Sequence, residues 1–261
     1  MKLFFKFFPI LLFGFALGFT SCSDDEDDNP ITDDANLEGK IRVQNEFQQP
    51  LYDERDGVLL FMEVGFQSFA VDADNVGSYV LPGAPTGTYT ITASKEGFGT
   101  IVREGIQISN VSPNFPVQEG NQILPTITIT KLPTTEFNNL SLEVSSDQDT
   151  PPEYTLTLNS EMNPGPPPTG QAKGFRIFIG QDENVGPENY IYQEHFATTD
   201  AAIEVIYEND WFDSLDLEQG DAIFAAIYGD ANFDQVLVLS NDTLFPNLTV
   251  NVGDISSVVL P

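Results

Sequence analysis

The stretch Thr88-Tyr89-Thr90-Ile91-Thr92-Ala93 decides the fold class of this chain. Its apolar residues Tyr89, Ile91 and Ala93 alternate with threonines, and successive side chains of a β-strand point to opposite faces of a sheet. The face with the apolar residues is therefore expected to pack in a core, and the face with the threonines is expected to contact water, as is typical of antiparallel sheets. A helix would instead repeat its apolar residues roughly every three to four positions.

Similar short alternating runs recur after residue 36, broken by Gly, Pro, Asn and Asp, and no run keeps a helical period. The sequence therefore predicts an all-β protein built from two tandem antiparallel β-sandwiches. Strands are expected near residues 39–43, 58–64, 69–71, 99–103, 126–130, 140–144, 154–158, 175–179, 190–192, 202–206, 222–228, 235–239 and 248–252.

The distribution of charge indicates two units of different character. Residues 37–131 hold 11 acidic and 6 basic residues, whereas residues 132–261 hold 22 acidic residues and only Lys173 and Arg176 as bases. Each segment is long enough to bury a core of its own. We therefore expect one domain at 37–131 and a second at 132–261.

The N-terminus carries the features of an export signal. Two lysines precede an apolar stretch of thirteen residues at 7–19, which is shorter than the roughly 20 residues of a membrane-spanning helix. Cys22 is the only cysteine of the chain, and Phe19-Thr20-Ser21-Cys22 resembles the lipobox of bacterial lipoproteins, with Phe19 where Leu is usual. The resemblance implies a signal peptide at 1–21 and a lipid on Cys22 that anchors the mature chain. The alternative is a secreted protein with a free thiol.

An acidic run follows Cys22 and opens a linker at 22–36. We expect this linker to be disordered, because its like charges repel and it has little apolar surface to bury. The run also resembles the surface-export signal of Bacteroidota lipoproteins, which implies a protein of the outer membrane that faces the cell exterior. The residues of the run are Ser23, Asp24, Asp25, Glu26, Asp27 and Asp28.

Residues 72–98 hold the most specific internal pattern. Gly77, Pro85 and Gly97 stand where tight turns would separate short strands. With this pattern, the segment 37–131 resembles the carboxypeptidase regulatory-like, transthyretin-like sandwich. The resemblance implies a non-catalytic spacer or binding module without an active site.

The C-terminal segment has a pattern of its own. Leu215-Asp216-Leu217-Glu218-Gln219-Gly220, followed by the strand expected at 222–228, resembles the loop and strand of fibronectin type III-like domains, although Phe224 replaces the usual tyrosine. An immunoglobulin-like or a carbohydrate-binding sandwich is the alternative. All three belong to the same fold class.

The residues needed for common catalytic sites are missing. His195 is the only histidine, and no nucleophile elbow, zinc-protease motif or phosphate-binding loop occurs. We therefore expect a protein that is not an enzyme. A small glycosidase needs only two placed carboxylates, so it stays open as an alternative.

Asp230, Asn232 and Asp234 carry side-chain oxygens at alternate positions, a spacing that lets a loop bind Ca²⁺. The segment lacks the glycine that usually follows and an acidic residue at the twelfth position. Calcium is therefore one hypothesis for these residues. A solvated turn between strands is the other.

Aromatic residues raise the hypothesis of sugar binding, since a flat ring can stack on the apolar face of a sugar. Trp211 and Phe212 are the favoured candidates, because they follow the polar stretch Glu208-Asn209-Asp210. Further candidates are Tyr190, Tyr192 and Tyr207.

The overall charge narrows the choice of partners. Without residues 1–21 the chain has 8 basic and 40 acidic residues, a net charge of −32, which opposes binding to nucleic acid. We therefore predict a surface-anchored protein that binds a glycan or a surface protein, as an accessory to uptake or adhesion. The alternative is a structural spacer or assembly component.

Overall fold

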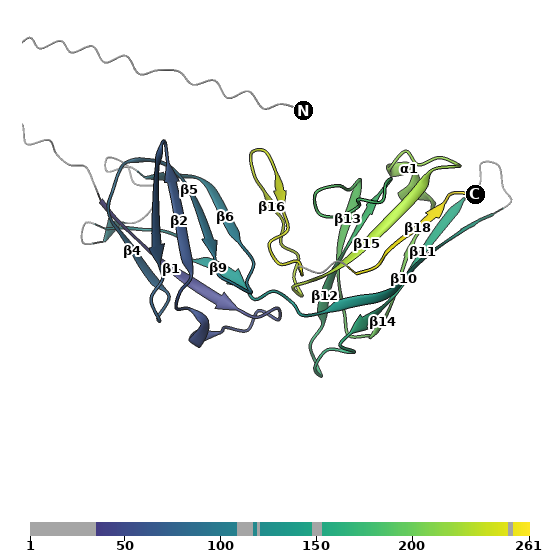
Figure 1. The fold of residues 1–261 in the computed structure, drawn as a ribbon, viewed down its shortest axis with the longest axis horizontal. Coiled ribbons are helices and arrows are strands. Elements are labelled where there is room, and N and C mark those ends of the chain that lie inside the picture. The colour runs from purple at the N-terminus through teal and green to yellow at the C-terminus, as the bar shows by residue number, and fades with distance from the viewer. Residues whose placement is uncertain (1–34, 109–116, 119–120, 148–152, 250–252) are drawn as a thin grey trace, which may run out of the picture. The chain divides into compact units, whose positions relative to one another are not determined.

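A computed structural model describes residues 35–108, 117–118, 121–147, 153–249 and 253–261. These residues belong to one compact unit, 33–261. The predicted all-β sandwich class is confirmed, because strands dominate the described chain and only short helical segments occur (Figure 1). No helix among the described residues is long and apolar enough to cross a membrane.

The N-terminal sandwich has two facing sheets. The first has the strand order β3-β2-β5-β6, and the second has the order β4-β1-β8-β7 with β9 also paired to β1. All its ladders are antiparallel except those of β1 with β8 and β9, which are parallel. Its elements are β1 (Ala35–Gln44), η1 (Tyr52–Glu54), β2 (Leu59–Val64), β3 (Gln67–Asp72), β4 (Ser78–Ala84), β5 (Gly87–Ser94), β6 (Ile101–Ile108), β7 (Val117–Gln118), β8 (Asn121–Ile123) and β9 (Ile127–Thr130).

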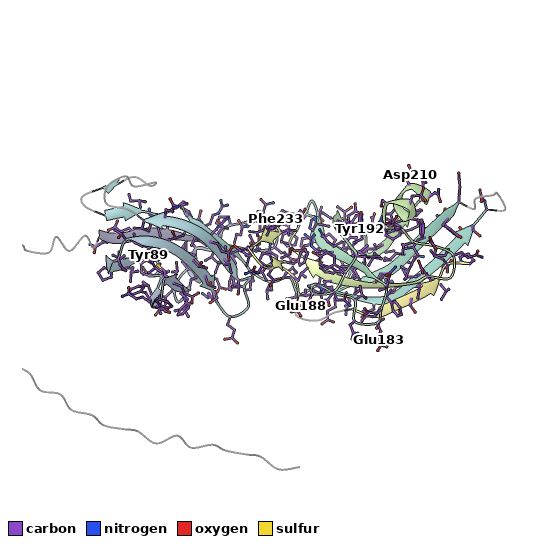
Figure 2. All side chains as sticks on the ribbon, turned by 90° about the horizontal axis from the view of Figure 1, so that it is seen from above. Tyr89, Glu183, Glu188, Tyr192, Asp210 and Phe233 are labelled. Atoms are coloured by element: carbon purple, nitrogen blue, oxygen red, sulfur yellow. The ribbon has the colours of Figure 1, made fainter. Side chains whose placement is uncertain are left out.

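The alternation in β5 produces the burial that the sequence predicts. Tyr89, Ile91 and Ala93 are fully buried, whereas the threonines between them are partly exposed. Tyr89, labelled in Figure 2, also donates a hydrogen bond from its hydroxyl to the Pro85 carbonyl at 2.7 Å. The core of this sandwich extends from Leu37 to Ile129.

The C-terminal sandwich also has two sheets, with the orders β10-β11-β14 and β13-β12-β15-β18. Its core extends from Phe137 to Leu260. The boundary between domains at 131 and 132 stays a proposal. The elements are β10 (Glu136–Ser146), β11 (Tyr154–Asn163), β12 (Lys173–Gly180), β13 (Tyr192–Thr198), β14 (Ala202–Tyr207), α1 (Asn209–Ser214), β15 (Ala222–Asp230) and β18 (Ile255–Val259). Between β15 and β18, β16 (Leu237–Val238) and β17 (Thr243–Leu244) form a separate two-stranded sheet, and Leu237 packs against the core of the N-terminal sandwich.

Strand β12 is buried on both faces. Phe175, Ile177 and Ile179 face the main core. On the opposite face, Phe178 contacts the ring of Phe245 at a centroid distance of 5.0 Å, within a separate small apolar cluster. This outer layer explains why β12 lacks the alternation of a half-solvated strand.

Several elements differ from the sequence prediction. The strand expected at 190–192 begins only at Tyr192 and continues to Thr198. No strand includes residues 248 and 249, whereas β4, β7, β8, β17 and β18 were not expected. The sequence of β18, ISSVV, is short, and two adjacent serines interrupt its apolar residues. The α1 helix was not expected either, since an isolated six-residue helix is unstable without tertiary contacts.

Candidate binding site

Strands β13 and β14 form an open edge of the C-terminal sandwich. They are consecutive in the chain, yet β13 pairs only with β12 and β14 pairs only with β11 among the described strands. No backbone pairing joins β13 to β14, so the two sheets of the sandwich stay open along this edge. Edge strands keep unpaired backbone groups that a ligand can reach.

The inward faces of these two strands line a groove. On β13, Tyr192, Glu194 and Phe196 share the face of the core residues that they oppose on β12. On β14, Val205 and Tyr207 face inward in the same way, opposite Leu158 and Leu156.

The groove consists of two adjoining hollows of about 680 and 420 Å³. Both are lined by Phe196, Val205 and Ile206, so they form one continuous surface, which we call the β13–β14 groove. The larger hollow extends toward Asp200, and the smaller extends toward α1. At a rise of roughly 3.3 Å per residue, the seven residues of β13 offer a length of about 20 Å. A chain-like ligand fits this form.

Three aromatic rings gather at the α1 end. Trp211 stacks on Tyr207 with a centroid distance of 4.5 Å and an interplanar angle of 26°. Tyr192 meets the edge of the indole at 5.5 Å. Tyr192 and Asp210, both labelled in Figure 2, line the smaller hollow from β13 and α1. The rings hold one another in place, which gives the groove a rigid aromatic wall.

The polar atoms of this wall are incompletely paired. The Tyr192 hydroxyl donates to Glu194 Oε2 at 2.8 Å, and burial followed by this contact raises the pKa of Tyr192 to about 12. The Tyr207 hydroxyl lies beside Glu194, and the Trp211 indole N–H lies beside Tyr192, although neither contact has the geometry of a standard hydrogen bond. Burial, assisted by the nearby Glu194 charge, also raises the pKa of Tyr207. Both donors are buried, so they belong to the packing of the wall.

The structure separates the two residues that the sequence favoured for ligand binding. Trp211 is partly exposed and lines the groove. Phe212 is only 1% exposed and packs in the core, so its ring has no face to offer a ligand. Of the further candidates, Tyr192 and Tyr207 line the groove. Tyr190 instead contacts Phe178 at a centroid distance of 5.4 Å in the separate small cluster.

Sequence reasoning missed the acidic residues of the groove. Glu194 lies at an inward position of β13, where an apolar residue is the rule. Inward charges on edge strands also oppose association of sheet edges, so this position protects the open edge of the sandwich. The spacing Tyr192-x-Glu194-x-Phe196 was the available signal, because period-two spacing places all three on one face of a strand.

Two of the three residues proposed for calcium, Asp230 and Asp234, contact an arginine. Arg176 Nε donates to Asp230 Oδ2 at 3.0 Å, and its other nitrogens donate to Asp234 Oδ1 and Gln193 Oε1. The Asn232 side chain accepts a bond from Gln48 at 3.5 Å. The guanidinium is already a full positive charge between the two carboxylates. No group of three or more His, Cys, Asp or Glu in the described parts of the chain is placed to hold a metal.

The Arg176 network is buried and closely packed. Arg176 and Asp230 are each 1% exposed, and the guanidinium carbon lies 5.0 Å from the ring centre of Phe245. Burial raises the pKa of Asp230, while the charges of Arg176 and His195 oppose that rise. Gly174 lets the chain approach closely here, because an added Cβ would lie 1.8 Å from the Ala231 oxygen. The network is a structural element of this sandwich.

The residues of the predicted lipidation site and surface-export signal lie outside the described part of the chain. They are Cys22, Ser23, Asp24, Asp25, Glu26, Asp27 and Asp28.

No protein-family model matches the sequence, and no curated protein matches it. Among solved structures, the chain is similar to a DUF3823 family protein from Parabacteroides merdae, with 12% identity, 75% of this chain and 90% of that chain covered, and a TM-score of 0.26. It is also similar to a protein from Bacteroides uniformis to which carbohydrate binding has been ascribed (14% identity, 87% and 99% covered, TM-score 0.30). A third is the major pilin SpaD of Corynebacterium diphtheriae (11% identity, 87% and 67% covered, TM-score 0.31). At such TM-scores these likenesses assign no function to this chain.

Proposed function

We propose that the protein is a non-catalytic lipoprotein that binds a glycan chain in the β13–β14 groove. Lipid on Cys22 would hold it at the outer membrane, facing the cell exterior. One observation carries the binding proposal: an open groove between two edge strands combines an aromatic wall with the carboxylates of Glu194, Glu208 and Asp210.

Each component suits a sugar. Aromatic rings cover the apolar faces of sugar rings, while hydroxyl groups need both donors and acceptors. The carboxylates of Glu194, Glu208 and Asp210 supply acceptors, and unpaired backbone N–H groups of the edge strands supply donors. The groove extends along both strands, so several sugar units of one chain can lie in it.

The single tryptophan makes the groove easy to observe, because Trp211 is the only one in the chain. A glycan that binds beside it should change the intrinsic fluorescence of the protein. We therefore expect a saturable fluorescence change when soluble oligosaccharides selected on a glycan array are titrated into the protein. Calorimetry should return the same affinity. An array without any hit, together with unchanged fluorescence, would contradict the proposal.

The same samples test the glycosidase alternative. Chromatography of an array hit after long incubation should show an unchanged glycan. Shortened products that disappear with Glu194→Gln would instead identify an enzyme.

The proposed lipid anchor and surface location need a separate experiment in the native host. Mass spectrometry of the mature protein should find an N-terminal acylated Cys22, and protease treatment of intact cells should degrade the protein. An unmodified thiol, or full protection until the outer membrane is broken, would contradict this part of the proposal.

A further inference from the structure

The charged residues that line the β13–β14 groove are all acidic. No lysine, arginine or histidine lines either hollow. Fixed negative charge in a concave site concentrates positive ligands and repels negative ones. The carboxylates are those of Glu194, Asp200, Glu204, Glu208 and Asp210.

No lysine or arginine on the surface of this sandwich offsets that charge. Lys173 and Arg176 are the only lysine and arginine of 132–261, and they are 6% and 1% exposed. His195 donates a hydrogen bond to the Ala231 carbonyl and lines neither hollow. Lys173 Nζ donates to the Pro164 carbonyl at 3.3 Å, and Arg176 is held by Asp230 and Asp234. Glu204, Glu208 and Asp210 have exposed side chains and form no salt bridge among the described residues.

The aromatic wall adds to the attraction for cations. The faces of aromatic rings carry negative partial charge and bind ammonium groups, with Trp the strongest of them. Tyr192, Tyr207 and Trp211 thus lie beside Glu194, Glu208 and Asp210 around one hollow. A ligand with an ammonium group therefore meets negative charge and aromatic surface together in this hollow.

We propose that the groove selects glycans that carry free amino groups over neutral glycans, and that it excludes glycans rich in carboxylate or sulfate groups. This inference rests on the proposed function and specifies the class of glycan. The ammonium groups lie against the acidic and aromatic end of the groove, and the sugar hydroxyls bind the remaining donors and acceptors.

A pair of matched oligosaccharides isolates the charge. Glucosamine oligomers and N-acetylglucosamine oligomers of equal length and linkage differ only in whether the nitrogen is charged or acetylated. In mildly acidic buffer of low ionic strength, calorimetry should give about tenfold tighter binding of the glucosamine oligomer. Added salt should reduce this preference, because salt screens exposed charges.

Two charge-matched variants locate the effect. Glu208→Gln/Asp210→Asn removes two exposed carboxylates of the groove, and we expect the preference to fall to about twofold. Glu183→Gln/Glu188→Gln removes the same charge from exposed residues that line neither hollow and are labelled in Figure 2. This control should keep the preference.

The outcomes separate this inference from the proposed function. Equal affinity for both oligomers, or equal effects of both double variants, would overturn the amine selectivity and leave glycan binding intact. Binding of basic peptides but of no oligosaccharide would overturn both, and would identify a protein partner. A preference that disappears only in the groove variant would support the inference.

Discussion

Replacing Arg176 by methionine is expected to lower the free energy of unfolding by about 3–5 kcal/mol. Arg176 is 1% exposed and holds the equally buried Asp230 at 3.0 Å. Methionine fills much of the space but leaves the carboxylate without its counter-charge in a dry interior. Chemical denaturation of both proteins measures the difference.

The pH dependence of that difference has a definite sign. Burial raises the pKa of Asp230, and Arg176 opposes the rise, so the variant should raise it further. A carboxyl with a raised native pKa binds protons more tightly in the folded than in the unfolded state, and its contribution to stability falls as pH increases through that window. The deficit of the variant should therefore shrink from neutral toward mildly acid pH.

Two further variants make the Arg176 prediction specific. Arg42→Met changes an exposed arginine of β1 and should alter stability by only about 0.5 kcal/mol. Arg176→Met/Asp230→Asn removes the stranded charge and should recover part of the loss. A single variant as stable as wild type at neutral pH would mean that the pair contributes nothing.

Phe212→Ala is expected to destabilise the protein by a similar amount, about 3–5 kcal/mol. The ring is 1% exposed, and its centroid lies 5.6 Å from Tyr154 and 5.0 Å from Trp211. Removing it leaves a cavity beneath α1, whose only buried residue it is. Thermal or chemical unfolding measures the loss.

Conservative variants distinguish a core residue from a ligand contact at these adjacent positions. Phe212→Leu keeps an apolar side chain and should cost less than about 1.5 kcal/mol, with glycan affinity unchanged. Trp211→Leu removes a ring that lines the groove and should abolish detectable binding by calorimetry. A folded Phe212→Leu protein that no longer binds the glycan would place Phe212 in the site.

Local patterns were enough to predict most strands. Tyr89, Ile91 and Ala93 alternate with threonines, and that alternation alone indicates which face is buried. β18 and α1 could not be predicted in this way. β18 is a strand because it pairs with β15, and α1 forms where Phe212 reaches the core. Both depend on contacts between residues far apart in the chain.

The sequence showed which residue types could bind a ligand, but it did not show which of them lie together in the folded protein. Tyr192, Tyr207 and Trp211 could be named as candidates from composition and local context. They share one wall because β13 joins the sheet of β12 while β14 joins the sheet of β11. Likewise, Asp230 and Asp234 had ligand spacing, and the fold supplied Arg176 as their cation. Alternation is a local property of neighbouring residues, whereas strand pairing and charge pairing are set by packing across long sequence separations.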